Sequence, residues 1–157
     1  MQSGLFGCNE ASFRCQAVVS WKAFGPWVRS EVAIQGCSLE SANLTDAMLG
    51  AGYAVQGANL TDADLTGANL TDALIGADLA TGNPADLADA DMEGANLSGA
   101  TVFEVDMTGA FLNNANLTGA SGLETSDLSG VVWDNTTCPD GMNSNDDGDT
   151  CVNNLGT

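Results

Sequence analysis

Residues 58–72 read ANLTD-ADLTG-ANLTD, and residues 95–99 read ANLSG. In each unit a small residue comes first, Asn or Asp second and a bulky apolar residue third, followed by two small or polar residues. A period of five fits neither an amphipathic helix, whose apolar residues recur every three or four positions, nor a simple strand, which alternates in twos. Because a fixed period over most of a chain is typical of a solenoid, the pattern predicts a coil whose sides are each five residues long.

The repeat continues outward from this stretch, from about Val32 to Trp133. The bulky third residue recurs in twenty units. These residues are Ile34, Leu39, Leu44, Leu49, Val55, Leu60, Leu65, Leu70, Ile75, Leu79, Leu87, Met92, Leu97, Val102, Met107, Leu112, Leu117, Leu123, Leu128 and Trp133.

With this register the chain resembles the pentapeptide-repeat family, whose units read A-(D/N)-L-x-x. The resemblance implies an all-β solenoid, a right-handed quadrilateral β-helix in which four units make one turn. The bulky residue and the small residue two before it would point inward, and the other three would face water. Twenty units would then give five turns and a rod of about 24 Å at the usual strand spacing. We therefore expect a β-helix at 32–133, between an N-terminal helical cap or interface segment at 1–31 and an acidic, disulfide-clamped C-terminal tail at 134–157.

Several places interrupt the count of five. One residue is extra near residues 53–56, one is missing near residues 74–75, and three are extra around residues 81–84, where TGNP indicates a turn. The register is unbroken from residue 87 to 117 and slips by one after residues 120–122. Insertions in solenoids map to loops on one face, often the binding face, and the alternative is an extension with no function.

The charge is strongly negative and unevenly distributed. Three Lys and Arg stand against 21 Asp and Glu, with no His, which gives a net charge of −18. Direct binding to a nucleic-acid backbone through a basic groove is therefore excluded. Arg14, Lys22 and Arg29 all precede residue 32, so the segment 1–31 carries +1 and the remainder carries −19. No run of 18 apolar residues exists that could form a transmembrane helix.

The N-terminal segment is rich in aromatic residues. Asn9 can cap a helix that Gly25-Pro26 ends, and Phe13, Trp21 and Phe24 fall on one face of it. One interpretation is a cap that covers the open end of the first turn, as solenoids require. The other is an interface onto another subunit, formed by Phe6, Phe13, Trp21, Phe24 and Trp27.

Cysteines mark both ends of the chain. The polar tail is bracketed by Cys138 and Cys151, and a disulfide between them would stabilise it by about 3 kcal/mol through loop closure. Cys8 and Cys15 are a second candidate pair, and Cys37, at an inward small position, is expected to be a buried free thiol. Paired cysteines favour an oxidising compartment, so we expect an extracellular or cell-surface protein whose signal peptide has been removed. Trp133, at the last inward position, is expected to plug the C-terminal end.

The tail also resembles a calcium loop. Residues 143–148 (NSNDDG) fit the opening of the D-x-[DN]-x-[DN]-G pattern with Asn in the first position, so Asn143, Asn145, Asp147 and Asp149 are the candidate metal ligands. The twelfth position is Asn154 instead of the bidentate Glu of that pattern. The alternative is a network of Asx turns held by the disulfide.

These features predict a protein without catalytic activity. With no His and no nucleophile or phosphate-loop motif, no catalytic residue is assigned, and the paired carboxylates recur only because the repeat recurs. We expect an exported structural or binding module that requires no cofactor and assembles head to tail with copies of itself. The family suggests an alternative, an acidic DNA mimic that binds a type II topoisomerase, although such relatives dimerise through a hydrophobic C-terminal helix. A third alternative is a calcium-dependent adhesin.

Overall fold

The computed structural model describes residues 38–49, 59–76 and 84–155. Several expectations concern residues outside this part, namely the helix from Asn9, the cap at 1–31 and the burial of Cys37. Within the described part, no helix is long and apolar enough to cross a membrane.

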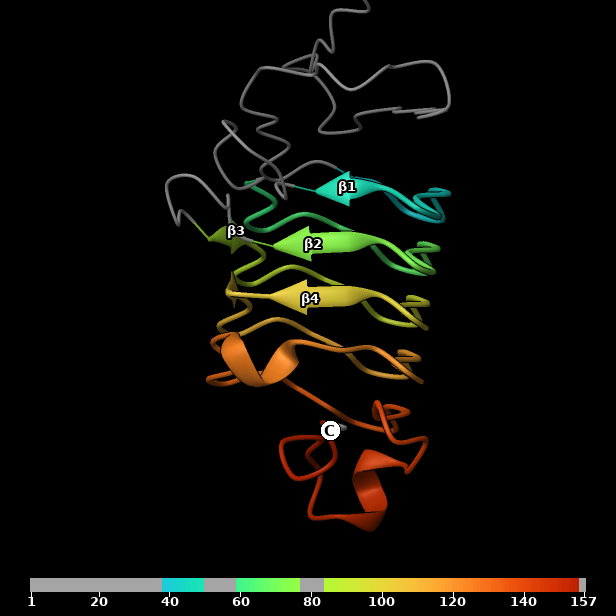
Figure 1. Ribbon diagram of the computed structural model, residues 1–157, viewed down its shortest axis with the longest axis vertical. Helices are drawn as coiled ribbons and strands as arrows, with labels where there is room; N and C mark the ends of the chain where they lie inside the picture. The colour runs from blue at the N-terminus through green and yellow to red at the C-terminus, as the bar shows by residue number, and fades with distance from the viewer. Residues whose placement is uncertain (1–37, 50–58, 77–83, 156–157) are drawn as a thin grey trace, which may run out of the picture.

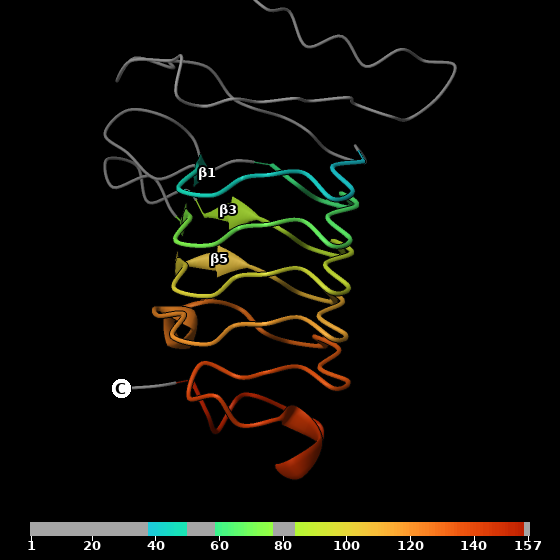
Figure 2. The same ribbon diagram turned by 90° about the vertical axis from the view of Figure 1, so that its right-hand side faces the viewer.

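Short strands and turns alternate along the chain. The strands are β1 (Met48–Leu49), β2 (Leu74–Gly76), β3 (Ala85–Asp86), β4 (Thr101–Phe103) and β5 (Val105–Asp106). Two 3-10 helices follow, η2 (Leu123–Thr125) and η3 (Ser144–Asp146). β1, β2 and β4 stack in parallel as one sheet, as Figure 1 shows, and β3 pairs with β5 in parallel as another, as Figure 2 shows.

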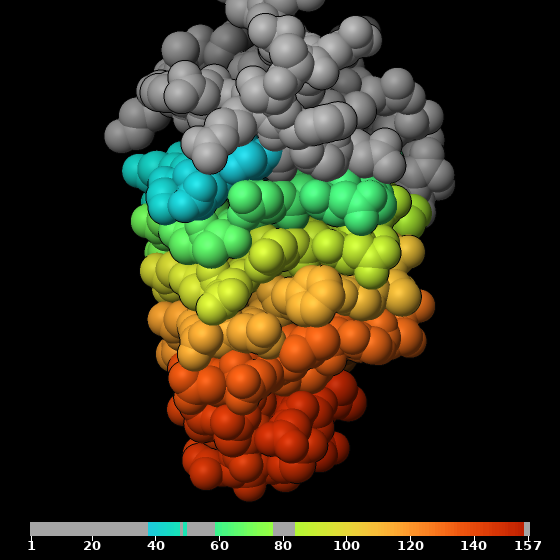
Figure 3. Space-filling view, turned by 180° about the vertical axis from the view of Figure 1, so that it is seen from behind, coloured from blue at the N-terminus to red at the C-terminus, as the bar shows by residue number. Residues whose placement is uncertain are grey.

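The pairing between turns gives the number of sides. Ala85 pairs with Val105 and Asp91 with Phe111, so in both pairs the partner lies four five-residue units further along the chain. One turn of the coil therefore has four sides. Successive turns form layers in chain order in the space-filling view (Figure 3). The expected four-sided β-solenoid is present in the described residues.

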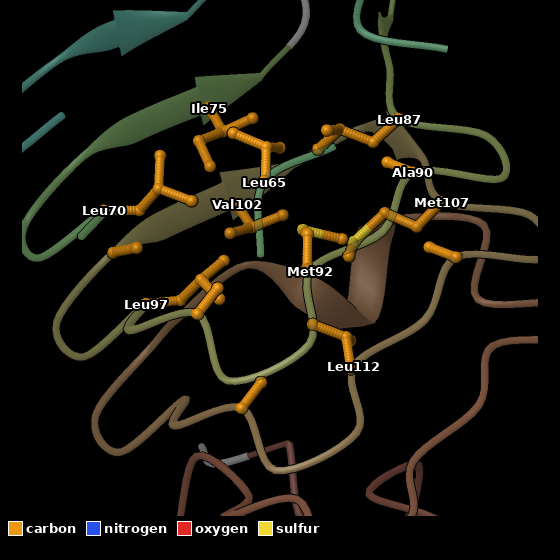
Figure 4. Packing of buried hydrophobic residues seen from close by; sticks show 14 of the residues in the cluster. Leu65, Leu70, Ile75, Leu87, Ala90, Met92, Leu97, Val102, Met107 and Leu112 are labelled. Carbon is orange, nitrogen blue, oxygen red and sulfur yellow. The ribbon is translucent and has the colours of Figure 1, made fainter. Parts of the chain in front are cut away.

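The third residue of each unit forms the core. We number the four sides by the column of residues that each turns inward. The first side holds Leu39, Leu65, Met92, Leu112 and Trp133; the second holds Leu44, Leu70, Leu97, Leu117 and Cys138; the third holds Leu49, Ile75, Val102 and Leu123; and the fourth holds Leu60, Leu87, Met107 and Leu128. All are buried except Leu128, which is partly buried. The prediction of an inward third position is confirmed for the described residues, whose buried side chains converge on the interior in Figure 4, whereas Ile34, Val55 and Leu79 lie outside them.

The small first residue of the unit is buried as well. Ala63, Ala68, Ala90, Ala95 and Ala100 are fully buried beside the bulky columns. The fifth residue adopts a left-handed conformation, with φ of 63° at Gly67 but also 56° at Asp62. Glycine accepts this φ without strain, and Asp is among the few other residues that enter the region readily. This requirement explains why Gly and Asp dominate the position.

The predicted register of the first two turns is wrong. Four consecutive units would stack Leu39 on Leu60, but Ser38 pairs with Asp64, so Leu39 stacks on Leu65. Likewise Asn59 pairs with Asp86 and not with a residue four units ahead. Each of these two turns is therefore longer than the regular four-unit turn by slightly more than one unit. The predicted register assumed four units in every turn. Residues 50–58 and 77–83, which the structure does not describe, fall within these two turns. An excess of about one unit preserves the apparent rhythm of the sequence.

The later register agrees with the prediction. For residues 85 to 101, each residue that pairs with the next turn does so with a partner four units ahead, and the last of these pairs joins Thr101 to Ser121. The spacing grows by one residue at the next pair, which joins Asp106 to Asp127. η2, preceded by Gly122 with a φ of 84°, accommodates the extra residue. Pairing then continues past the expected end of the repeat at Trp133, because Thr137 pairs with Asn116 and Cys138 is buried over Leu117.

The tail closes the C-terminal end of the coil. The disulfide between Cys138 and Cys151 is present, with a Cα to Cα distance of 5.3 Å, which confirms that prediction. The tail turns back on the last coil turn through an antiparallel bridge between Thr137 and Asn143. Trp133 is only 4% exposed, but it is not the last inward residue as expected, because Cys138 follows it in the coil; the Trp133 carbonyl oxygen accepts a hydrogen bond from the Ser144 hydroxyl.

Candidate binding surfaces

The outer surface of the described coil carries acids without cations. All three basic residues stand at positions 14, 22 and 29, so the described ranges contain no Lys, Arg or His. The carboxylates there can therefore form no salt bridge with a side chain of the same part of the molecule. The compensating positive charge must come from outside the described ranges, from water, counterions, a partner or the three basic residues at 14, 22 and 29.

The fourth side carries a column of stacked carboxylates. Asp86 pairs with Asp106 and Asp106 with Asp127, so the three follow one another on consecutive turns at about 4.8 Å. Each Oδ1 accepts the backbone N–H two residues ahead, at Ala88, Thr108 and Ser129. Hydrogen bonds from the Ser129 side chain and backbone lower the pKa of Asp127. The column is thus fixed in position by the same Asx turns that shape the coil.

This column adjoins further acids around the corner of the coil. The corner that joins the fourth side to the first carries Asp62 and Asp89, and the first side continues with Asp91 and Glu93. All four are exposed. We call the continuous set the acidic surface; it comprises Asp62, Asp64, Asp86, Asp89, Asp91, Glu93, Asp106 and Asp127.

Removing the central charge of the column is expected to stabilise the protein. Asp106→Asn keeps an Oδ1 that can accept the N–H of Thr108 while it removes repulsion from Asp86 and Asp127. The gain is about 1 kcal/mol in total, since exposed like charges at this spacing repel by about that amount in water. Thermal unfolding at low salt should show a rise of about 3 °C in Tm, which disappears at high salt as the charges are screened.

The matched control is Asp140→Asn. Asp140 makes the same type of Asx bond, to the N–H of Met142, but lies outside the column. An equal rise in Tm for both variants would contradict the assignment of repulsion to the column.

The second side presents an uncharged ladder instead. Asn43, Asn69, Asn96 and Asn116 pair on successive turns. Within each unit the hydroxyl two residues after the Asn donates to the Asn Oδ1, at 2.7 Å from Thr45 and 2.6 Å from Thr71. Between turns, Asn96 Nδ2 donates to Thr71 Oγ1 at 3.0 Å. The ladder links consecutive turns and uses most of its own hydrogen-bonding groups to do so.

Two of the four candidate calcium ligands, Asn143 and Asn145, form hydrogen bonds within the tail and with the last turn of the coil. Asn143 caps η3 by accepting the N–H of Asn145, and its Nδ2 donates to Asn135 Oδ1 at 3.0 Å. Asn145 Oδ1 accepts the N–H of Asn135 at 2.8 Å. The bond from Asn145 N to Asn143 Oδ1 is of the Asx type that the alternative to a metal site requires. Asp149 is exposed, and Asp147 carries one buried oxygen, Oδ2, that has no hydrogen-bond partner among the described residues.

No cluster of three or more His, Cys, Asp or Glu side chains suited to a metal ion occurs within residues 38–49, 59–76 and 84–155. The amide oxygens of Asn143 and Asn145 are further potential ligands of calcium, so calcium binding by the tail stays a prediction. The other candidate residues, Cys8 and Cys15 and the aromatic set Phe6, Phe13, Trp21, Phe24 and Trp27, lie outside the described residues.

The sequence analysis missed an apolar pair on the first side. Phe111 is 43% exposed and Val132 is 38% exposed, and the two pair on adjacent turns. Both occupy the second position of the unit, where Asn or Asp is usual. The signal was present in residues 110–114 (AFLNN) and 131–135 (VVWDN), which depart from the repeat at that position.

Comparison with known proteins identifies the repeat. Residues 55–80 and 85–119 match the family described as pentapeptide repeats, in eight copies. No curated protein shows a significant sequence match. A pentapeptide repeat protein from the thylakoid lumen of Arabidopsis thaliana is 26% identical, with a TM-score of 0.45, over 74% of this chain and 74% of that one.

Two further solved structures are similar. HetL, a pentapeptide repeat protein involved in heterocyst differentiation regulation in the cyanobacterium Nostoc sp. strain PCC 7120, is 29% identical, with a TM-score of 0.43, over 71% of this chain and 55% of that one. A trypsin-treated variant of QnrB1, a plasmid-mediated fluoroquinolone resistance protein, is 14% identical, with a TM-score of 0.21, over 67% of this chain and 65% of that one.

Proposed function

Since this chain belongs to the pentapeptide-repeat proteins, we propose that it acts as an exported, non-enzymatic binding rod that assembles with copies of itself. The observation that carries the proposal is the separation of charge. The described coil has an acidic surface and no cation, whereas every basic side chain of the protein lies within residues 14–29.

This separation favours a head-to-tail contact. The basic residues precede the first turn in the sequence, and the acidic surface runs along the turns that follow. A contact between two different surfaces of identical chains is heterologous. Each added molecule leaves one basic segment and one acidic surface free, so the assembly can continue into a fibre or a layer. The net charge of −18 opposes close approach of whole molecules, so the local attraction must outweigh it.

The disulfide supports export. Cys138 and Cys151 are both fully buried and bonded to each other. Structural disulfides persist in oxidising compartments and are rare in the reducing cytosol. The disulfide therefore supports the proposal that the protein acts outside the cytosol, at the cell surface or beyond.

Sedimentation velocity tests the assembly. We expect the weight-average sedimentation coefficient to rise with protein concentration, and the rise to shrink as salt screens the contact. Repeating the series with calcium and with a chelator separates assembly through charge alone from assembly that needs the metal. A strict monomer up to millimolar concentration, with calcium present, would refute self-assembly.

A second candidate is an acidic DNA mimic that binds a type II topoisomerase, and charge density favours it. Five carboxylates, Asp89, Asp91, Glu93, Glu104 and Asp106, fall within the single turn 87–106. A turn rises about 4.8 Å, over which duplex DNA carries about three phosphates. The coil thus reaches the charge density of DNA locally. Gyrase supercoiling that is unchanged by excess protein would exclude this candidate.

A third candidate is a calcium-dependent adhesin, which the unbonded Asp147 Oδ2 favours. Calcium bound by Asn143, Asn145, Asp147 and Asp149 would stabilise the tail. Chelation should then lower the temperature at which the tail unfolds, and an unchanged transition would exclude this candidate.

A further inference from the structure

The exposed apolar pair on the first side is unusual for its position. Phe111 and Val132 stand in the column that begins with Ser38, Asp64 and Asp91, where the other second-position residues are polar. Their backbones are fixed by inter-turn bonds, from Phe111 N to Ala90 O and from Val132 N to Ala110 O, both 3.0 Å. The two side chains therefore lie side by side on one flat wall of the coil, about one strand spacing apart.

Acids border this pair on the same side. Asp91 pairs directly with Phe111 from the preceding turn, and Glu93 follows Asp91 by two residues. Asp134 follows Val132 by two residues. All three are exposed. We call Asp91, Glu93, Phe111, Val132 and Asp134 the acceptor patch; its chemistry suits a segment that combines large apolar side chains with cations.

The protein itself contains one such segment. Residues 21–29 read WKAFGPWVR and hold Lys22, Arg29 and three aromatic side chains. The remaining basic residue, Arg14, precedes Lys22 by eight positions, so the nine residues 21–29 hold two of the three basic side chains of the protein. The charge of this segment is opposite to that of the acceptor patch, and its aromatic residues match the apolar pair.

We propose that residues 21–29 of one molecule bind the acceptor patch of a second copy. This inference rests on the self-assembly proposed above and names the surface on which it occurs. The aromatic side chains cover Phe111 and Val132, where burial of apolar area supplies affinity, while Lys22 and Arg29 meet Asp91, Glu93 and Asp134. Partial burial strengthens these charge contacts relative to contacts in open water.

The acceptor patch lies far along the coil from its first described turn. Three turns separate Ser38, the first described residue, from Phe111, because the column runs through Asp64 and Asp91. At about 4.8 Å per turn the distance along the axis is about 14 Å. Binding in trans leaves one free patch and one free segment in a dimer. Binding within one molecule would saturate both, and the mixing experiment below distinguishes the two arrangements.

The test uses the full chain and two variants. The acceptor variant, Phe111→Thr with Val132→Thr, removes the apolar pair; Thr already occupies the second position of the unit at Thr101, which pairs with Leu74, and at Thr137, which pairs with Asn116. The donor variant, Lys22→Gln with Arg29→Gln, removes the cations. Met142→Thr with Val152→Thr is the matched control, because each of these tail residues is 52% exposed.

Each of the first two variants is expected to weaken self-association at least tenfold in sedimentation equilibrium, and the control is expected to leave it unchanged. Mixing the acceptor variant with the donor variant should restore a one-to-one dimer, because each supplies the surface that the other lacks. The mixture cannot extend further, so its association should stop at the dimer.

The outcomes separate the site from the function. If the wild-type protein associates and the acceptor variant associates equally well, the acceptor patch is wrong while self-assembly stands. If the mixture stays monomeric while the wild-type protein associates, binding in trans between these two surfaces is overturned. If the wild-type protein is itself monomeric, the proposed function fails together with the patch. Equal melting temperatures of the acceptor variant and the control show that loss of association is not loss of fold.

Discussion

Replacement of Leu97 by alanine should lower the free energy of unfolding by about 3 kcal/mol, within the range observed for buried Leu→Ala changes. Leu97 is 1% exposed and stacks between Leu70 and Leu117 in the inward column of the second side. The cavity can collapse little, because the backbone on either side of Leu97 is tied to the turns above and below. Leu97 N donates to Asn116 O at 2.7 Å and Asn96 N donates to Ala68 O at 2.9 Å.

Urea unfolding followed by circular dichroism measures this loss. Leu128→Ala is the matched control, since Leu128 is only partly buried near the last turn and should cost less. In a solenoid each turn contacts only its neighbours, so the central cavity should also broaden the transition as the two halves uncouple. A loss under about 1 kcal/mol at Leu97, or a larger loss at Leu128, would contradict the packing described for this column.

Removal of the disulfide is expected to cost about as much, about 3 kcal/mol for a loop of this length in the chain-entropy description. The variant is Cys138→Ala with Cys151→Ala, which removes both partners of the crosslink. The tail between them is held to the last turn by hydrogen bonds, among them Ser144 N to Thr136 O at 2.8 Å, Cys138 N to Met142 O at 2.8 Å and the bonds of Asn143 and Asn145 to Asn135. Without the crosslink these bonds alone must offset the entropy of ordering the tail.

Hydrogen exchange localises the effect. In the double variant the amides of Ser144 and Thr136 should exchange far faster, while the amide of Leu97, near the middle of the coil, should stay protected. The cysteines at other positions remain unchanged, so the comparison isolates this crosslink. Unaltered exchange at Ser144 would show that the hydrogen bonds of the tail hold it without the disulfide.

Much of the architecture was predicted from the sequence because the repeat is local. Leu60, Leu65 and Leu70 point inward, as expected, since five residues return the chain to an equivalent side. The bond between Cys138 and Cys151 was also predicted, because a polar tail with two cysteines offers no other anchor. The choice between a calcium loop and Asx turns could not be made from the sequence, since both use the same oxygen-bearing residues at alternate positions.

The candidate surfaces were predicted only in part. The sequence shows the net negative charge and its concentration after residue 31. The arrangement of these acids into one acidic surface depends on which turns of the coil are neighbours. Asp86, Asp106 and Asp127 form a column only because of the pairing between consecutive turns. Phe111 and Val132 are more than four units apart in sequence and meet only through the same stacking.

The sequence by itself determined that this chain coils in five-residue sides with a dry interior, because burial of every fifth side chain is a property of neighbouring residues. Only the tertiary structure decided which sides lie above one another. The segments 50–58 and 77–83 fall within the two longer turns, from Ser38 to Asp64 and from Asn59 to Asp86, where the sequence rhythm had suggested regular sides. Hydrogen bonds between turns join residues four or more units apart, so they, and not the local pattern, fix the stacking and every outer surface built from it.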